Sequence, residues 1–223
     1  MSGAGGGRRK GSVPLNRDRV LAAAVTLADT EGLGAVTMRS LAEALGVRPM
    51  SLYHYVRNKE ELLDGMVDLV FARIDLPRVG EPWRTEMRRR AVSARQVLTR
   101  HPWALALMDT RTAPGPATLR HHDAVIGVLT ANGFSAAMTE RAYVTIDAYV
   151  YGFVLQEASL PLDDQGGTAD VAESVMVGFD QERYPHLAAF AVGHLMRADY
   201  VFGEHFEPGL DLVLDMVGAL LER

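Results

Sequence analysis

Residues 37–56 combine hydroxyl, aromatic and imidazole side chains at a spacing that suits contacts with nucleic acid. The sequence predicts two short helices joined at Gly46, with Leu52, Tyr55 and Val56 on the inward face of the second helix. The outer face of that helix then carries Met50, Ser51, Tyr53 and His54. Apolar and aromatic side chains on a solvated face find partners in the phosphates and base edges of DNA. We therefore interpret the segment as a DNA-binding helix-turn-helix.

An ordinary helical hairpin is the alternative interpretation of the same pattern. In that case Tyr53 and His54 would pack against a neighbouring element. Two cations favour the DNA-binding interpretation, because Arg39 lies on the first helix of the pair and Lys59 opens the helix that follows. These positions suit contacts with the sugar-phosphate strands on either side of a groove.

Hydrophobic periodicity predicts an all-α fold, since apolar residues recur at helical spacing and no segment shows two-residue alternation. Asn16 and Thr37 are expected to cap the first two helices, and Pro49 to open the third. Asn58 and Glu61 match a capping box at the start of the fourth helix. We expect nine or ten helices in all, the later ones near 83–100, 103–109, 116–131, 135–157, 184–202 and 206–222, with a mobile loop over 160–172.

The charge is unevenly distributed along the 223 residues, whose net charge is −5. Residues 1–60 hold nine Lys and Arg against five acidic residues, a net charge of +4, so the remainder carries −9. A basic first quarter favours binding to a polyanion. The chain has no cysteine, which excludes disulfides and thiol chemistry, and no signal peptide or membrane-spanning segment is apparent. We expect a cytoplasmic protein.

Three segments follow from this pattern. Residues 1–15 are rich in glycine and basic residues and are expected to form a flexible arm. Residues 16–62 form the predicted helix-turn-helix domain, and residues 63–223 form a larger helical domain.

Residues 16–63 resemble the DNA-binding domain of the TetR family of transcriptional regulators. The resemblance lies in Thr37-Met38-Arg39, in Leu45-Gly46-Val47, in Leu52-Tyr53-His54-Tyr55-Val56, and in Asn58-Lys59 with Leu62-Leu63. It implies that the family's DNA contacts fall on Thr37, Arg39, Pro49, Met50, Ser51, Tyr53, His54, Tyr55 and Lys59. Tyr53 and Lys59 are the phosphate contacts we expect first.

A weaker resemblance to the tetracycline-repressor type of C-terminal domain covers Asn132-Gly133-Phe134-Ser135 and the ending Phe206-Glu207-Pro208-Gly209. It implies a homodimer through the helices near 135–157 and 206–222. A palindromic operator read by two such heads also requires two-fold symmetry. The expected apolar stripe on the final helix consists of Leu210, Leu214, Val217 and Leu221.

The resemblance also implies an inducer site between the fourth helix and the later helices. The candidates that would line it are Met66, Val70, Trp103, Met108, Arg111, Ile126, Tyr143, Asp147 and Tyr151. Arg111 and Asp147 stand out, since a buried charge requires a partner. Where tetracycline-binding members of the family have a histidine at the end of the fourth helix, this chain has Ile74 and Asp75, so a tetracycline–magnesium ligand is not expected.

We expect no catalytic residue, cofactor or metal site. None of the common hydrolase, nucleotide-binding or metalloprotease motifs occurs. The pairs His121-His122 and His194 with His205 lack the spacing of metal ligands, so surface or capping roles are expected. The function predicted is a ligand-responsive repressor. The alternatives are a DNA-binding protein whose C-terminal domain only dimerises, and a helical enzyme.

Overall fold

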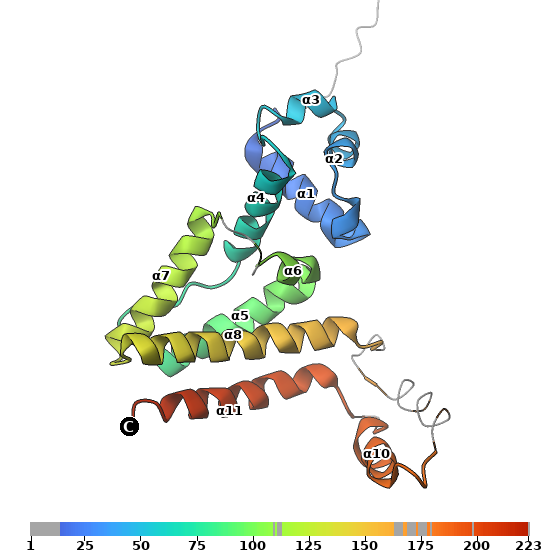
Figure 1. Ribbon diagram of the computed structural model, residues 1–223, viewed down its shortest axis with the longest axis vertical. Coiled ribbons are helices and arrows are strands. Elements are labelled where there is room, and N and C mark those ends of the chain that lie inside the picture. Colours follow the sequence, from blue (N-terminus) through green and yellow to red (C-terminus); the bar gives the residue numbers. More distant parts are fainter. Residues whose placement is uncertain are drawn as a thin grey trace, which may run out of the picture. The chain divides into compact units, whose positions relative to one another are not determined.

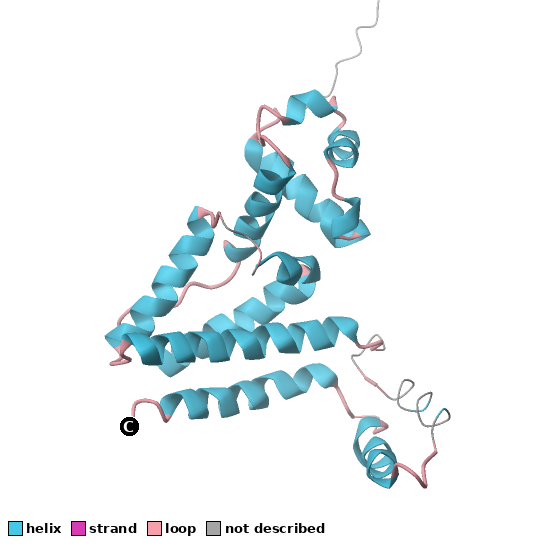
Figure 2. Cartoon of the chain, in the orientation of Figure 1, coloured by secondary structure: helices cyan, strands magenta, loops and turns pink. Residues whose placement is uncertain are grey.

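The computed structural model describes residues 14–108, 110, 113–162, 167–168, 173, 178, 180–197 and 199–222. Every regular element within these residues is helical (Figures 1 and 2), which confirms the all-α prediction. The chain divides into two compact units, Met1–Met66 and Val67–Arg223. The division falls inside helix α4 (Lys59–Phe71), so this helix contributes residues to both units.

The first unit contains α1 (Arg17–Glu31), the 3-10 turn η1 (Leu33–Ala35), α2 (Met38–Leu45), α3 (Pro49–Leu52) and the first half of α4. Asn16 caps α1 as predicted, because its side chain accepts the N–H of Arg19 at 2.8 Å. Helix α2 packs against both α1 and α3. The fully buried core of this unit consists of Val20, Ala24, Val36, Leu41, Leu52, Val56 and Leu62.

The prediction that the third helix extends to residue 56 is wrong, because α3 ends at Leu52 and residues 53–55 form turns. The N–H of Val56 still bonds to the carbonyl of Leu52 at 3.0 Å, so Val56 returns to the core. Asn58 accepts the N–H of Glu61 at 2.8 Å, and a residue in this capping role needs a non-helical backbone. The chain therefore leaves the helical conformation before α4 begins.

The second unit is built around α8 (Ala136–Ser159). Helix α8 packs against α5 (Trp83–Arg100), α7 (Pro116–Ala131) and α11 (Phe206–Gly218), and Figure 1 shows α8 and α11 side by side. Shorter elements complete the unit: η2 (Pro102–Ala104), α6 (Leu105–Met108), α10 (Pro185–Phe190), the π-helical turn η3 (Ala191–Leu195) and the 3-10 turn η4 (Phe202–His205).

One cation ties the three long helices together. The guanidinium of Arg95 on α5 lies 2.5 Å from a carboxylate oxygen of Glu157 on α8. The same guanidinium lies 5.1 Å from the ring centre of Phe153 and 4.9 Å from that of Phe206, the first residue of α11. Ion pairing and cation–π contact therefore act together on one side chain.

Two predicted helices near the end of the chain differ from the structure. The single helix expected over 184–202 is wrong, because α10 ends at Phe190 and continues as the π-helical turn η3. Gly193 lies inside this turn, and glycine favours a local departure from the α-helix. The last helix ends at Gly218 rather than at residue 222. The loop expected over 160–172 lies partly outside the described residues.

The apolar stripe expected to face a partner subunit lies instead in the chain's own core. Leu210, Leu214 and Val217 are buried, whereas Leu221 follows the end of α11 and is 39% exposed. A different face of α11 carries the exposed apolar side chains Leu212 and Met216.

Candidate DNA-binding surface and ligand site

Local interactions fix the turn between α2 and α3. Thr37 and Ser40 form a reciprocal capping box, in which each side-chain oxygen accepts the other residue's N–H at 3.0–3.1 Å. Gly46 ends α2 in the left-handed conformation, with φ of 66°, which glycine adopts without strain. Pro49 then occupies the first turn of α3, where its missing N–H has no cost.

The turn leaves the predicted DNA-binding face open to solvent. Met50 is 73% exposed and Tyr53 is 44% exposed. None of the nine predicted contact residues is buried: Thr37, Arg39, Pro49, Met50, Tyr53, His54 and Lys59 are exposed, and Ser51 and Tyr55 are half-buried. We call these nine residues the α3 face. An exposed Met and Tyr side by side on such a short helix form an apolar surface ringed by polar groups.

The charges beside the α3 face are lightly held. Arg39 pairs with Glu43 at 3.1 Å, and both side chains are exposed. Such surface pairs contribute little to stability, so a DNA phosphate can replace Glu43 as the partner of Arg39.

Glu61 closes the segment between α3 and α4, in a way that differs from the predicted capping box. Its carboxylate accepts the N–H of Arg57 at 2.9 Å, where the motif would have it accept the N–H of Asn58. Hydrogen bonds from the backbone and side chain of Arg57 lower the pKa of Glu61. The box is therefore only half formed, with Asn58 capping α4 and Glu61 bonding one residue earlier.

A buried polar cluster occupies the second unit where α5, α7 and α8 pack together. Arg90 on α5 is 1% exposed, donates one hydrogen bond to the carboxylate of Asp147 on α8, and donates another from Nε to Nε2 of His121 on α7 at 2.8 Å. The hydroxyl of Tyr151 donates to the second carboxylate oxygen of Asp147 at 3.2 Å. These four residues, with His122 and Tyr143, are called the Arg90 cluster below.

Aromatic rings complete the surroundings of the cluster. The guanidinium of Arg90 lies 5.6 Å from the ring centre of Tyr143, whose hydroxyl hydrogen-bonds with Nδ1 of His122. Phe71, the last residue of α4, packs with its ring centre 5.3 Å from that of His121 and 5.8 Å from that of His122. Four helices therefore contribute to one site.

Burial and the single buried ion pair set the charges of this cluster. Burial would lower the pKa of Arg90, but the carboxylate of Asp147 outweighs it and raises that pKa, so the cation is retained. Burial, with the charge of Arg90 second, lowers the pKa of His121 to about 3. Burial raises the pKa values of Tyr143 and Tyr151. At neutral pH the site therefore holds one cation, one anion, neutral imidazoles and neutral phenols.

The structure brings three of the nine predicted ligand-site residues together. Tyr143, Asp147 and Tyr151 follow one another at four-residue spacing on α8 and all belong to the Arg90 cluster. Of the others, Met66, Val70 and Trp103 are buried, Met108 is half-buried, Ile126 is 45% exposed, and Arg111 lies outside the described residues.

Sequence reasoning missed Arg90, His121 and Phe71. The expectation of a surface or capping role for His121 is wrong, because this side chain is fully buried. Helical spacing carried the signal: His121 continues a buried stripe on α7 that includes Ala117, Val125 and Val128. Arg90 likewise falls on the buried face of α5 that includes Met87, Ala91, Ala94 and Leu98.

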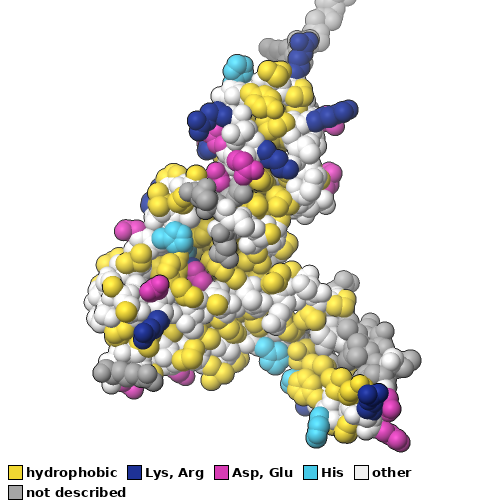
Figure 3. Space-filling model, viewed as in Figure 1, with side chains coloured by type: hydrophobic (Ala, Val, Ile, Leu, Met, Phe, Trp, Pro, Cys, Tyr) yellow, Lys and Arg dark blue, Asp and Glu magenta, His cyan; other side chains and the backbone are white. Residues whose placement is uncertain are grey.

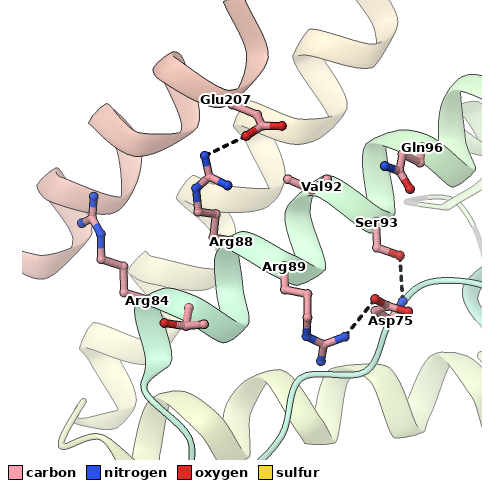
Figure 4. A pocket seen from close by; sticks show the side chains of 9 residues that line it. Asp75, Arg84, Arg88, Arg89, Val92, Ser93, Gln96 and Glu207 are labelled. Atoms are coloured by element: carbon pink, nitrogen blue, oxygen red, sulfur yellow. Dashed lines mark hydrogen bonds and ion pairs between the residues drawn. The ribbon is translucent and has the colours of Figure 1, made fainter. Parts of the chain in front are cut away.

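An open groove of about 550 Å³ runs along α5 beside α11 (Figure 4). Its arginines are all paired: Arg88 with Glu207 at 2.8 Å, Arg89 with Asp75 at 2.9 Å, and Arg84 with Asp215 of α11 at 2.8 Å. Because each cation already has a carboxylate partner, these residues hold α11 and the segment before α5 in place.

Neither a metal site nor a membrane span is found in the part of the chain that the structure describes. Its His, Asp and Glu residues form no group of three or more that could hold a metal ion. Among the same residues, no helix combines the length and apolar character needed to cross a bilayer.

The exposed α3 face, carried by a small helical unit and joined to a larger one, defines a helix-turn-helix transcriptional regulator. Two family models match the chain: "Bacterial regulatory proteins, tetR family" over residues 20–66, and "Tetracyclin repressor-like, C-terminal domain" over residues 76–220. The chain belongs to the TetR family of DNA-binding transcriptional regulators, and it is not an enzyme.

Individual relatives agree with this assignment. An HTH-type transcriptional regulator of Saccharopolyspora erythraea is 35% identical over 175 residues, which cover 78% of this chain and 74% of the relative. The HTH-type transcriptional repressor DrrR1 of Streptomyces coeruleorubidus is 31% identical, over 97% of this chain and 83% of its own. The solved structure of ActR from Streptomyces coelicolor with actinorhodin has a TM-score of 0.76 at 26% identity, covering 93% of this chain and 97% of ActR.

Proposed function

We propose that this chain is a repressor that binds a palindromic operator as a homodimer and is released by a small-molecule ligand. The observation that carries the ligand response is the Arg90 cluster. A buried ion pair with attached phenols and imidazoles adds little to stability, since the loss of hydration offsets the attraction between the charges. Polar groups gathered in an otherwise apolar helical core are typical of a ligand site. The complex of ActR with actinorhodin is an example in a structural relative.

The α3 face is proposed to bind the major groove. In helix-turn-helix proteins the second helix of the motif contacts base edges and its neighbours contact the backbone. Met50 and Pro49 suit contact with a thymine methyl, whereas Tyr53 and Lys59 suit contact with phosphates. Thr37 and Arg39 at the start of α2 are proposed to contact the adjacent strand.

The homodimer is proposed to form through exposed faces of α8 and α11. Val144 and Leu155 on α8 and Leu212 and Met216 on α11 are each 59–72% exposed. Hydrophobic side chains also gather over α10 (Figure 3), where Tyr184, Leu187 and Phe190 are 47–55% exposed. Large apolar side chains exposed on neighbouring helices are typical of a protein interface.

Release is proposed to act through α4, which supplies residues to both units. Phe71 at its end packs on His121 and His122, so a ligand at the Arg90 cluster would displace Phe71 and shift the end of α4. A dimer binds two half-sites about 34–36 Å apart, and a change in head separation removes this match.

The test is footprinting of the purified protein on the DNA upstream of its own gene, followed by a screen for compounds that release it. We expect a protected palindrome and at least one compound that lowers operator affinity. The matched variant carries Arg90→Met with Asp147→Leu, which removes both buried charges together. It should bind the operator and no longer respond to the compound. A protein whose C-terminal unit only dimerises would bind the operator with an affinity that no compound changes.

A further inference from the structure

His121 presents a buried hydrogen-bond donor that lacks an acceptor. Its Nε2 lies 2.8 Å from Nε of Arg90. An arginine N–H can only donate, so Nε2 must accept and the ring proton of the neutral imidazole sits on Nδ1. Among the described residues nothing accepts a hydrogen bond from Nδ1, although the side chain of His121 is fully buried.

Buried polar groups in folded proteins are nearly always satisfied, and one that is not lowers stability. Arg90 makes the position of this donor well defined, because it holds the opposite side of the imidazole ring. Arg90 is itself held by Asp147, which Tyr151 bonds in turn. The chain of contacts therefore fixes the direction of the free N–H from three helices.

The surroundings of this donor are aromatic. The ring centre of His122 lies 6.3 Å from that of His121, and the ring centre of Tyr143 lies 5.6 Å from that of His122. Phe71 covers both imidazoles from α4. Such rings favour stacked or edge-on contact with another aromatic ring.

We infer that the ligand is a planar aromatic compound whose ring carbonyl or phenol-type oxygen accepts the hydrogen bond from Nδ1 of His121. The inference rests on the proposed function, because it names the ligand class for the same site.

Two ligand classes are excluded at this position by the same geometry. An organic cation would face an N–H donor beside the buried guanidinium of Arg90, and both repel positive charge. A metal chelate cannot bond to His121, because Nε2 accepts from Arg90 and Nδ1 carries the proton. The lowered pKa of His121 keeps this donor neutral at physiological pH.

Matched ketone and hydrocarbon probes test the inference. Fluorenone is compared with fluorene, and tetralone with tetralin, because each pair shares its ring skeleton and differs in the carbonyl oxygen. Binding to the full-length protein is followed by quenching of the fluorescence of Trp83 and Trp103. In the wild-type protein at least one ketone should bind about tenfold more tightly than its hydrocarbon.

Two substitutions separate the donor from the contact with Arg90. His121→Gln places an amide oxygen near Nε2, so it keeps an acceptor for Arg90 and removes the donor at Nδ1. His121→Asn places an amide N–H near Nδ1 and removes the acceptor for Arg90. The preference for the ketone should fall to about one in His121→Gln and persist in His121→Asn. A purely structural role of His121 would not separate the two variants.

The outcomes distinguish this inference from the proposed function. Equal binding of ketone and hydrocarbon by the wild-type protein, or binding of neither, overturns the inference even if a variant fails to fold. Operator footprinting and compound screening are scored separately. If the operator is bound and a compound releases it while the ketone preference is absent, the proposed function stands and the ligand class is wrong. If no operator is bound, the proposed function fails whatever the probes do.

Discussion

The side chain of His121 shows how its surroundings change the chemistry of one residue. On a helix surface an imidazole titrates near pH 6.5 and alternates between two charge states. Inside the second unit it is fully buried and accepts a hydrogen bond from a permanent cation. Protonation would place two like charges together in the core. His121 is therefore a fixed neutral group, and the Arg90 cluster acquires a donor of constant direction.

The pH dependence of stability tests this state of His121. The unfolded chain takes up a proton near pH 6.5, whereas folding lowers the pKa of His121 to about 3. Between these pH values the unfolded state binds more protons, so the free energy of unfolding falls as the pH drops. His121→Gln should remove a slope on the order of 1 kcal/mol per pH unit, measured by urea unfolding from pH 7 to pH 5.

The control for this prediction is His186→Gln, because His186 is exposed on α10. This variant should keep the wild-type slope. An unchanged slope in His121→Gln would show that the imidazole is protonated in the folded state.

Tyr53 tests the α3 face at the level of one residue. It is 44% exposed, so its removal should leave the free energy of unfolding nearly unchanged. Tyr53→Ala should weaken operator binding by roughly 1–3 kcal/mol, measured by fluorescence anisotropy with the footprinted DNA. Tyr184→Ala is the matched control, since Tyr184 is 47% exposed in the second unit. Equal affinity of the two variants would remove Tyr53 from the DNA contacts.

Helix α7 depends on a cap that comes from another helix. The carboxylate of Asp68 on α4 accepts the N–H of Thr118 at 2.8 Å and its hydroxyl at 3.0 Å, in the first turn of α7. Gly115 precedes this turn, and a side chain there would meet the same carboxylate, since an added Cβ would lie 2.3 Å from its carbon. The end of α4 and the start of α7 are therefore joined directly, next to the Phe71 contact.

Removing this cap tests its role. Asp68→Ala should lower the free energy of unfolding by about 1 kcal/mol, the usual cost of losing an N-terminal cap. Chemical denaturation measures the change, with Asp123→Ala as the control because Asp123 is an exposed carboxylate on α7 itself. Equal stability of the two variants would mean that Asp68 does not support α7.

At the scale of the whole molecule, repression requires two copies of a chain whose two units have different charge. The basic first unit suits DNA, whereas the acidic remainder suits contact with another protein and repels the DNA backbone. The apolar residues available for the contact are those that the core leaves exposed, namely Leu212 and Met216 on α11 with Val144 and Leu155 on α8.

Charged substitutions on α11 test the assembly. Leu212→Glu with Met216→Glu should weaken dimerisation by about tenfold or more, because two carboxylates would be buried without partners. Analytical ultracentrifugation measures the change. Val79→Glu is the control, since Val79 is 62% exposed in the same unit but lies between α4 and α5. A dimer of wild-type strength in the double variant would exclude this face of α11.

The sequence by itself determined the helices and the turn of the DNA-binding motif, because their signals are local. Asn16 and Thr37 cap helices through residues three positions away, and Gly46 needs only its own backbone conformation. Helical spacing and family resemblance also predicted the exposed α3 face. The length of α3 was wrong because α4 begins with a capped turn that the pattern did not weigh.

Only the tertiary structure decided the composition of the Arg90 cluster. Arg90 meets His121 across 31 residues and Asp147 across 57 residues of sequence. Periodicity places a residue on the buried face of its helix, but the partner depends on how the helices pack. The same packing decided that Leu210 and Leu214 lie in the chain's own core and that Leu212 stays exposed. Local structure follows from neighbours in sequence, whereas the chemistry of this site follows from neighbours in space.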